Sequence, residues 1–320
     1  MNEIDIVIPW VNPEDDVWFN DYKEACNKYD GDKHPARIRD YGIFNYWFRA
    51  VETNMPWIRY IHLFVYSETQ IPKWLNINNP KLKIHFHREI IPEKYLPTFN
   101  SNIFFRYIYK LKDLSEKFIY FNDDIIPFNF IEPSDYFEND IPKDCSVISN
   151  QINANPIHEC ILNRFNVKWP KQNLDSFLIT VKNSLDLCKK YTNKFNIYCN
   201  PHIGIAALKS EVEKIFTDLD IDLNNIFTDG KFRKTTDVVC GWMYRYIRLN
   251  LGNFKEQDLS KLVYTEIRNE NFYKELSKLL DCKMICLNDI LDNNANIKLI
   301  GERLNELLNV LFPNKSGFEK

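Results

Sequence analysis

The stretch KFIYFNDD, from Lys117 to Asp124, joins an apolar run to a polar end. Residues 118–121 indicate a buried strand, and the amide of Asn122 and the carboxylates of Asp123 and Asp124 follow directly. Open α/β sheets hold ligands beyond the carboxyl ends of their strands, so these oxygens predict a metal or phosphate site. The alternative is a strand-end turn in which Asn and Asp only accept hydrogen bonds from backbone amides.

Strands and helices alternate before this stretch. Strands are predicted where apolar, β-branched and aromatic residues cluster, at 4–11, 60–66 and 81–87. A turn is predicted at 12–16, and apolar periodicity predicts helices at 41–52 and 98–114. This alternation is typical of an α/β fold with a mostly parallel sheet.

The pattern changes beyond residue 133, where further helices are predicted at 174–191 and 211–219. We therefore expect three parts: an α/β core at 1–140, a largely helical insertion or cap at 141–230, and a segment at 231–320. The last part is expected to return to the core and complete the active site.

Composition limits the class of protein. The 320 residues are 45% hydrophobic and include 23 Phe and 17 Tyr, enough to fill a sizeable core. The net charge of -3 argues against a nucleic-acid partner, whose phosphates require basic surfaces. The eight cysteines contain no Cys-x-x-Cys pair, and no apolar run approaches the about 18 residues of a membrane span. We expect reduced thiols and a cytoplasmic location.

Other polar residues offer the chemistry of a phosphate or metal site. The carboxylates of Asp123 and Asp124 suit Mg²⁺ or Mn²⁺ better than zinc. Arg39 follows Arg37 and offers a guanidinium fork for phosphate oxygens. Asn100 and Ser101 enter a predicted helix, where they either aim amides at a phosphate or act as N-caps. His202, Arg233 and Asp237 supply a base, a cation and a carboxylate, each equally compatible with a structural role.

The order and wording of four blocks resemble the Stealth phosphotransferases, which include bacterial capsular polysaccharide enzymes and the animal N-acetylglucosamine phosphotransferase. The resemblance rests on residues 4–12, 37–137, 201–237 and 285–289, the last followed by 311–316. These blocks reach from nearly the first residue to the last. The resemblance implies a Rossmann-like, GT-A-like fold whose 1–140 core binds a nucleotide sugar.

The same resemblance implies a reaction at phosphorus, in which a hexose phosphate passes from a UDP-sugar to a saccharide hydroxyl and UMP is released. As hypotheses, Asp124 and Asn288 hold Mg²⁺ or Mn²⁺, with Asp123 and Asp289 nearby. His202 is the expected general base, with Asp123 as its rival, and Arg233 stabilises the charge on the transferred group. The residues expected to hold the donor are Asp5, Trp10, Asn12, Arg39, Asp40, Asn100, Ser101 and Asp237.

One departure from the family pattern concerns the helix before Lys117. Members commonly read Asn-Ser-x-x-Ile-Glu, whereas Phe105 stands here at the Glu position, and Tyr109-Lys110 replaces a familiar His-Arg. This departure leaves open a catalytically silent saccharide- or nucleotide-binding subunit. A metal-dependent glycosyltransferase that releases UDP is a second alternative, in the same broad class as the transferase. The expected partners are a UDP-sugar and a saccharide or lipid-linked glycan, with peripheral contact to the inner membrane face or the capsule assembly machinery.

Overall fold

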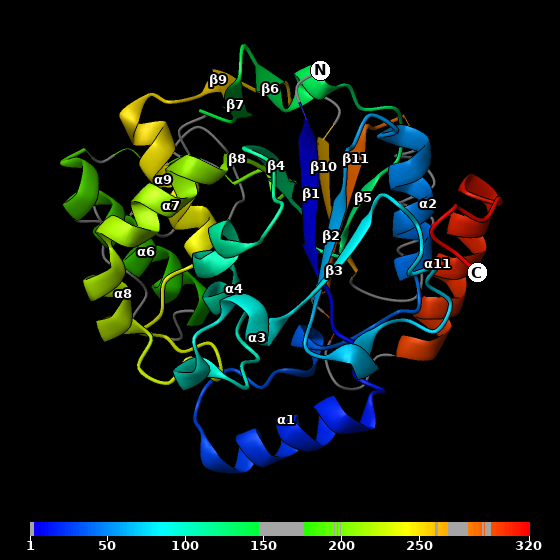
Figure 1. Cartoon of the computed structure of the whole chain (residues 1–320), viewed down its shortest axis with the longest axis horizontal. Helices are drawn as coiled ribbons and strands as arrows, with labels where there is room; N and C mark the ends of the chain where they lie inside the picture. The colour runs from blue at the N-terminus through cyan, green and yellow to red at the C-terminus, as the bar shows by residue number, and fades with distance from the viewer. Residues whose placement is uncertain are drawn as a thin grey trace.

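A central sheet of five strands organises the chain (Figure 1). The computed structural model describes residues 3–146, 176–194, 196, 198, 200–259, 262–267, 281–289, 291 and 296–320. The strand order is β3-β2-β1-β4-β8, with bounds β1 Ile4–Pro9, β2 Ile61–Val65, β3 Leu82–Phe86, β4 Lys117–Tyr120 and β8 Ile205–Leu208. The first four strands are parallel, and β8 pairs antiparallel with β4. The predicted α/β fold with a mostly parallel sheet is confirmed.

A second sheet begins directly after the turn that follows β4. Strand β5, Ile125–Pro127, directly follows the Asn122–Asp124 turn and pairs antiparallel with β11, Met284–Asp289. Strand β11 also pairs in parallel with β10, Leu262–Ile267. A third small sheet joins β6 Phe137–Glu138, β7 Ile141–Asp144 and β9 Lys255–Glu256. The Asn122–Asp124 turn therefore joins the central sheet to the second sheet.

Helices cover both faces of the central sheet (Figure 1). One face packs against α2, Phe44–Asn54, and α11, Ile297–Leu311. The opposite face packs against α4 Ser101–Tyr107, α6 Ser176–Thr192, α7 Lys209–Asp218 and α9 Cys240–Leu251, with α8 Asp220–Ile226 beside them. The short α3, His87–Ile90, follows β3. In the part of the chain that the structure describes, no helix is both long and apolar enough to cross a membrane.

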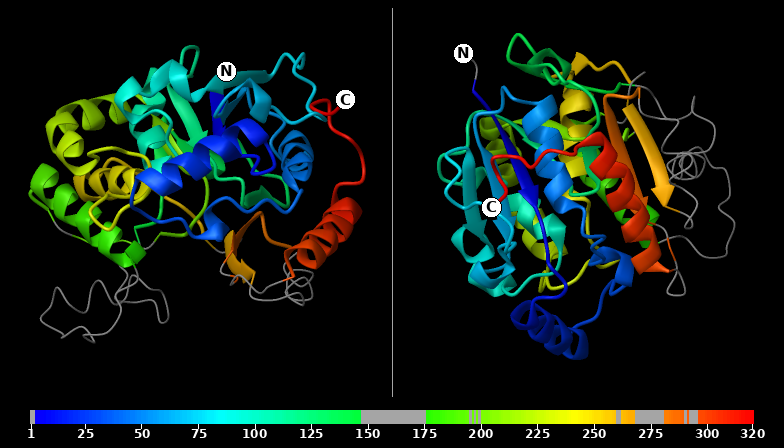
Figure 2. Two further views of the ribbon diagram at one scale, coloured as in Figure 1. Left: turned by 90° about the horizontal axis from the view of Figure 1, so that it is seen from below. Right: turned by 90° about the vertical axis from the view of Figure 1, so that its right-hand side faces the viewer.

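Helix α1, Asp16–Lys28, lies at the end of the molecule to which β1 points (Figure 2). Its Trp18 and Tyr22 pack in a separate aromatic cluster with Phe232 and Phe99. The turn predicted at 12–16 ends at Asp15, because the Asp15 side chain accepts a hydrogen bond from Val17 N and caps the helix. This helix was absent from the sequence prediction.

Most other predicted elements are present with shifted ends. The helix predicted at 98–114 begins at Ser101, because the Asn100 side chain accepts from Asn102 N at 3.1 Å and acts as its N-cap. It then tightens into a 3₁₀ turn at Ile108–Lys110. In the range 141–230, α6, α7 and α8 are helical as expected, yet β8 joins the main sheet. The division at residues 140 and 230 stays a prediction.

Candidate functional site

The turn after β4 carries a carboxylate with unused bonding capacity. Asp124 Oδ1 is buried and has no hydrogen-bond partner among the described residues. Its Oδ2 lies 3.6 Å from the Cys286 thiol, which donates to it. The backbone carbonyl of Asp124 accepts from Leu287 N at 2.8 Å, so β11 fixes the turn from one side. A buried acceptor without a donor is costly unless a ligand supplies one.

His202 completes a small cluster with this carboxylate. One ligand atom from each of Asp124, His202 and Cys286 lies within 4.8 Å of the others. The backbone of His202 is left-handed, with φ of 52°, and its N–H donates to Asn200 Oδ1 at 2.9 Å. Its ring stacks on Tyr264 with centroids 5.4 Å apart and planes 18° apart. A non-glycine residue held in this conformation is a mark of functional sites.

Burial and charge change the protonation of this cluster. Burial raises the pKa of Asp124, although the nearby His202 opposes the shift. The Asp123 side chain is exposed to solvent. Loss of hydration to the surrounding protein is nevertheless the main reason that its pKa is raised to about 7, and the negative charges of Asp124 and Asp40 add to the shift. Burial and then the Asp124 charge raise the pKa of the Cys286 thiol well above its usual range. A cation bound to the sulfur would displace the thiol proton of Cys286.

Strand β11 places two predicted metal ligands on opposite faces. Side chains alternate along a strand, so Asn288 shares the face of Cys286 and lies half-buried on the side of Asp124. Asp289 points the other way. Its carboxylate accepts from Arg39 Nη1 at 2.8 and 2.7 Å and from the Tyr41 hydroxyl at 2.8 Å. Asn288 therefore lies on the cluster side of β11, whereas the Asp289 carboxylate is paired with Arg39.

The loop before α4 and the segment at 231–237 form one unit. Arg233 Nη2 donates to Ser101 Oγ at 2.6 Å. Asn100, which caps α4, also donates through Nδ2 to Asp237 Oδ2 at 2.9 Å. Burial and then the positive charge of Arg37 lower the pKa of Arg233 to about 10. Burial raises the pKa of Asp237 to about 6, against the hydrogen bonds that it accepts.

Tyr120, the last residue of β4, connects this unit to the carboxylates. Burial is the main cause of its raised pKa, the charge of Arg233 lowers it, and the charges of Asp123 and Asp124 raise it. One phenol therefore lies within electrostatic reach of the guanidinium and of both carboxylates. The predicted cation Arg233 and the predicted carboxylates Asp123 and Asp124 therefore lie in one region at the end of β4.

Asp5 lies apart from that region, near the start of β1. Its side chain is fully buried and accepts from Arg59 at 2.8 and 2.6 Å and from Ser115 N at 2.8 Å, with His62 Nε2 at 3.1 Å. These contacts occupy both carboxylate oxygens. The structure does not bring Asp5 to the cluster.

Trp10, Asn12 and Asp40 have mainly internal contacts. The Trp10 ring is 8% exposed and stacks on Phe44 at 5.0 Å and 7°. Asn12 Oδ1 accepts from Glu14 N at 3.0 Å, and Asp40 Oδ1 accepts from Gly42 N at 2.9 Å. Burial raises the pKa of Asp40. The negative charge of Asp40 contributes to the raised pKa of Asp123, so Asp40 lies within electrostatic reach of the turn after β4.

Comparison with known proteins places the chain in a family. Residues 37–144 match conserved region 2 of Stealth proteins, and residues 275–320 match conserved region 4. The capsular polysaccharide phosphotransferase WcwK of Streptococcus pneumoniae is 32% identical over 341 residues, which cover 100% of this chain and 99% of the relative. An exopolysaccharide phosphotransferase of Lactiplantibacillus plantarum is 31% identical, covering 99% of this chain and 96% of its own. The chain belongs to the Stealth family.

This Stealth protein is accordingly an enzyme of the phosphotransferase class, as the sequence predicted. Among solved structures, the galactosyltransferase LgtC aligns over 96% of this chain and 95% of its own, with 10% identity and a TM-score of 0.44. That distant likeness concerns the fold alone.

Phe105, which stands where the family commonly has Glu, is part of the hydrophobic core of this Stealth protein. Phe105 is 2% exposed and packs edge-on against Tyr120 at 4.9 Å, with Phe216 and Tyr244 beside it. It reaches no part of the surface. A glutamate here would need a buried partner for its charge, whereas phenylalanine needs none.

Sequence reasoning missed two members of the site, Cys286 and Tyr264. Cys286 stood inside a block that was recognised for Asn288, and the period of two along a strand would have placed both on one face. Tyr264 pairs with Cys286 across β10 and β11, and no short motif marks it. Its contact with His202 depends on pairing between strands that are distant in the chain.

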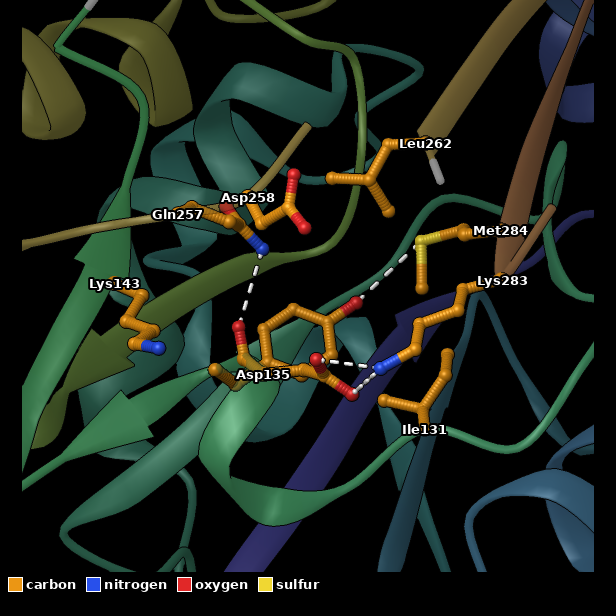
Figure 3. Close-up of a pocket in the computed structure, with 9 residues that line it drawn as sticks. Ile131, Asp135, Lys143, Gln257, Asp258, Leu262, Lys283 and Met284 are labelled. Carbon is orange, nitrogen blue, oxygen red and sulfur yellow. Dashed lines mark hydrogen bonds and ion pairs between the residues drawn. The ribbon is translucent and has the colours of Figure 1, made fainter. Parts of the chain in front are cut away.

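A small cavity of about 60 Å³ lies elsewhere, between the 3₁₀ turn Pro133–Asp135, the residues after β9 and the start of β11 (Figure 3). Lys283 forms an ion pair with Asp135 at 2.7 Å, and the Tyr136 hydroxyl donates to Met284 Sδ at 3.4 Å. The cavity has room for a few water molecules but not for a nucleotide sugar. Met284 and Asn288 occupy opposite ends of β11. We therefore take the turn after β4 as the candidate functional site.

Proposed function

We propose that this protein transfers a hexose-1-phosphate from a UDP-sugar to a saccharide hydroxyl, forming a phosphodiester and releasing UMP. The cluster of Asp124, His202 and Cys286 at the carboxyl end of β4 carries the proposal. Relatives over the full length are named capsular or exopolysaccharide phosphotransferases, which supports a surface polysaccharide or lipid-linked glycan as the acceptor. In this proposal the acceptor is met at the inner face of the plasma membrane, through peripheral contact with the membrane or the assembly machinery.

His202 is the general base of the proposed reaction. Its stacking on Tyr264 and its fixed backbone orient the ring beside Asp124. The imidazole accepts the proton of the acceptor hydroxyl as its oxygen forms a bond to the phosphorus next to the donor sugar. The bond from that phosphorus to the bridging oxygen breaks, and UMP leaves with the electron pair. Asp123 is the rival base, since its pKa is raised to about 7.

Arg233 supplies positive charge to the transferred phosphoryl group. Its guanidinium donates a hydrogen bond to Ser101, and its charge acts on Tyr120, as do the charges of Asp123 and Asp124. Preorganised charge of this kind stabilises a transition state in which negative charge spreads over phosphoryl oxygens. Asn100, Asp237, Arg39, Asp40, Trp10 and Asn12 remain proposed donor contacts, whereas the buried ion pairs of Asp5 favour a structural role for that residue.

The donor set fits a divalent cation. Asp124 Oδ1 is buried without a partner among the described residues, and Asn288 lies on the same strand face as Cys286. Asp124 and Asn288 would hold Mg²⁺ or Mn²⁺, which would neutralise charge on the donor diphosphate. Asp289 is the weaker metal candidate because Arg39 and Tyr41 already saturate it.

The nucleotide product tests the proposal. The purified protein is incubated with Mg²⁺, a panel of UDP-hexoses and saccharide acceptors, and the nucleotides are separated by chromatography. Formation of UMP in step with acceptor-linked phosphodiester is expected. Release of UDP instead would establish the glycosyltransferase alternative. UDP-sugar binding without turnover across the panel would favour the silent binding subunit, the alternative that Phe105 at the family's Glu position motivates.

A further inference from the structure

The three side chains at the cluster have different donor atoms. Asp124 offers a carboxylate oxygen, His202 an imidazole nitrogen and Cys286 a sulfur, all within 4.8 Å. Magnesium prefers oxygen ligands, whereas imidazole and thiolate together are typical of zinc and related transition metals. The cluster therefore fits a softer cation than the Mg²⁺ or Mn²⁺ of the proposed function.

The distances agree with a tetrahedral ion. Zinc bonds to sulfur at about 2.3 Å and to carboxylate oxygen at about 2.1 Å, so these two ligands lie about 3.6 Å apart on a tetrahedron. The observed separation of Asp124 Oδ2 and Cys286 Sγ is 3.6 Å. The second oxygen, Asp124 Oδ1, is buried and has no partner in the described part of the chain. The Asp124–Cys286 pair already has the spacing of two tetrahedral ligands, and the His202 nitrogen lies within 4.8 Å of both.

Each ligand is held by its own element. Cys286 pairs with Ile125 across β11 and β5, which fixes it against the turn that carries Asp124. His202 precedes β8 and is fixed by Asn200 and by the Tyr264 ring. The sulfur is fully buried, whereas Asp124 and His202 are partly exposed, so an ion would reach the site from their side.

We propose that Asp124, His202 and Cys286 form a site for a thiophilic divalent cation of the Zn²⁺ class. Binding forms a metal–sulfur bond, and the thiol proton of Cys286 passes to solvent. His202 cannot accept a substrate proton while its nitrogen is bound to the ion. If the proposed phosphoryl transfer is correct, Zn²⁺ therefore inhibits it by competing with Mg²⁺ at Asp124.

Cobalt(II) provides a direct test, because a Co²⁺–thiolate bond gives a charge-transfer absorption band in the near ultraviolet. The metal-free full-length protein is titrated with Co²⁺, and then Zn²⁺ is added to displace it. Wild type is expected to develop the band with one Co²⁺ per chain and to lose it with one Zn²⁺. Cys286→Ser is expected to abolish the band, whereas the matched control Cys282→Ser, a buried thiol just before β11, keeps it.

A second variant keeps the test decisive if Cys286→Ser fails to fold, which circular dichroism reports. His202→Gln is expected to weaken Co²⁺ binding at least about tenfold while the band persists at saturation. Absence of the band in wild type, its survival in folded Cys286→Ser, or unchanged affinity in His202→Gln overturns the proposal. The band is measured without substrate, so it stands or falls independently of UMP release. Zn²⁺ inhibition of UMP release links the two results.

Discussion

At the scale of single residues, Asp124 is the most informative side chain. It is half-buried, burial raises its pKa, and Oδ1 lacks a hydrogen-bond donor among the described residues. Each of these features costs free energy in the empty protein, and a bound cation relieves all of them at once. A carboxylate placed only to cap a turn would accept backbone amides with both oxygens.

Asp124→Asn is expected to lower Mg²⁺-dependent turnover at least about 100-fold, because the amide keeps the shape but loses the charge that holds the cation. UMP release at saturating donor measures the effect. Asp222→Asn is the matched control, since Asp222 on α8 forms a surface ion pair with Lys190 on α6. Turnover equal to wild type in Asp124→Asn would exclude this carboxylate as a metal ligand.

Asp289→Asn is expected to act on stability rather than on metal binding. The Arg39–Asp289 pair is largely buried, with side chains 9% and 13% exposed, so removing one charge leaves the other uncompensated. Such changes cost about 3 kcal/mol in the free energy of unfolding. Urea denaturation measures that loss, and calorimetric titration with Mn²⁺ measures the affinity. Weakened Mn²⁺ binding at unchanged stability would instead restore Asp289 as a ligand.

At the scale of elements, the sequence pattern correctly predicted the strands and helices whose formation depends on their own apolar side chains. The strands β1, β2 and β3 and the helix α2 form near the predicted residues because their apolar side chains face the core on both sides of the sheet. Helix α1 was missed because Asp15 and Asp16 read as turn residues. Asp15 is in fact an N-cap, and only the packing of Trp18 and Tyr22 against distant aromatics makes the helix favourable.

The amino end of β1 provides a pH-dependent contribution to stability. Burial of Asp5 opposes ionisation, but the hydrogen bonds from Arg59, His62 and Ser115 outweigh it and lower the pKa from 3.8 to about 2. The folded pKa is lower than the unfolded one, so this stability is complete above about pH 4 and is lost as the pH falls toward 2. The shift corresponds to about 2 kcal/mol.

Wild type is therefore expected to lose about 2 kcal/mol more unfolding free energy than Asp5→Asn between pH 4 and pH 2. Urea unfolding curves at several pH values in this window measure the difference. The variant has no carboxyl group to protonate at this position, so its unfolding free energy at each pH is the baseline for wild type. A gap between the two proteins that stays constant with pH would contradict the assignment.

At the scale of the whole molecule, the site is assembled from segments that spacing alone does not connect. Asp124 and Cys286 are 162 positions apart and meet because β5 and β11 pair antiparallel. The sequence pattern indicated Asp124 and His202 separately, and the family resemblance added Asn288 and put the three in one site. The separation of Asn288 from Asp289 required the actual strand register, and the contacts of Arg39 and Asp5 required the tertiary fold.

Helix α2 links the last residues of the chain to this site. Arg49 donates to Glu319 through Nε at 2.7 Å and Nη2 at 2.8 Å, and through Nη1 to Phe312 O at 2.9 Å. Two residues earlier, Trp47 Nε1 donates to Ile125 O at 3.0 Å, directly after the Asp124 turn. The Arg49–Glu319 pair is therefore expected to stabilise the helix against which that turn packs.

Glu319→Gln is expected to lower the free energy of unfolding by about 3 kcal/mol, because the side chains of the pair are only 9% and 5% exposed and Arg49 would keep an uncompensated charge. Glu302→Gln on α11 is the matched control, since its carboxylate is 56% exposed and lies 4.0 Å from Lys298, and its change should stay within about 0.5 kcal/mol. Urea denaturation measures both. Equal losses in the two variants would show that the buried pair does not hold α2, and turnover should follow the folded fraction of each protein.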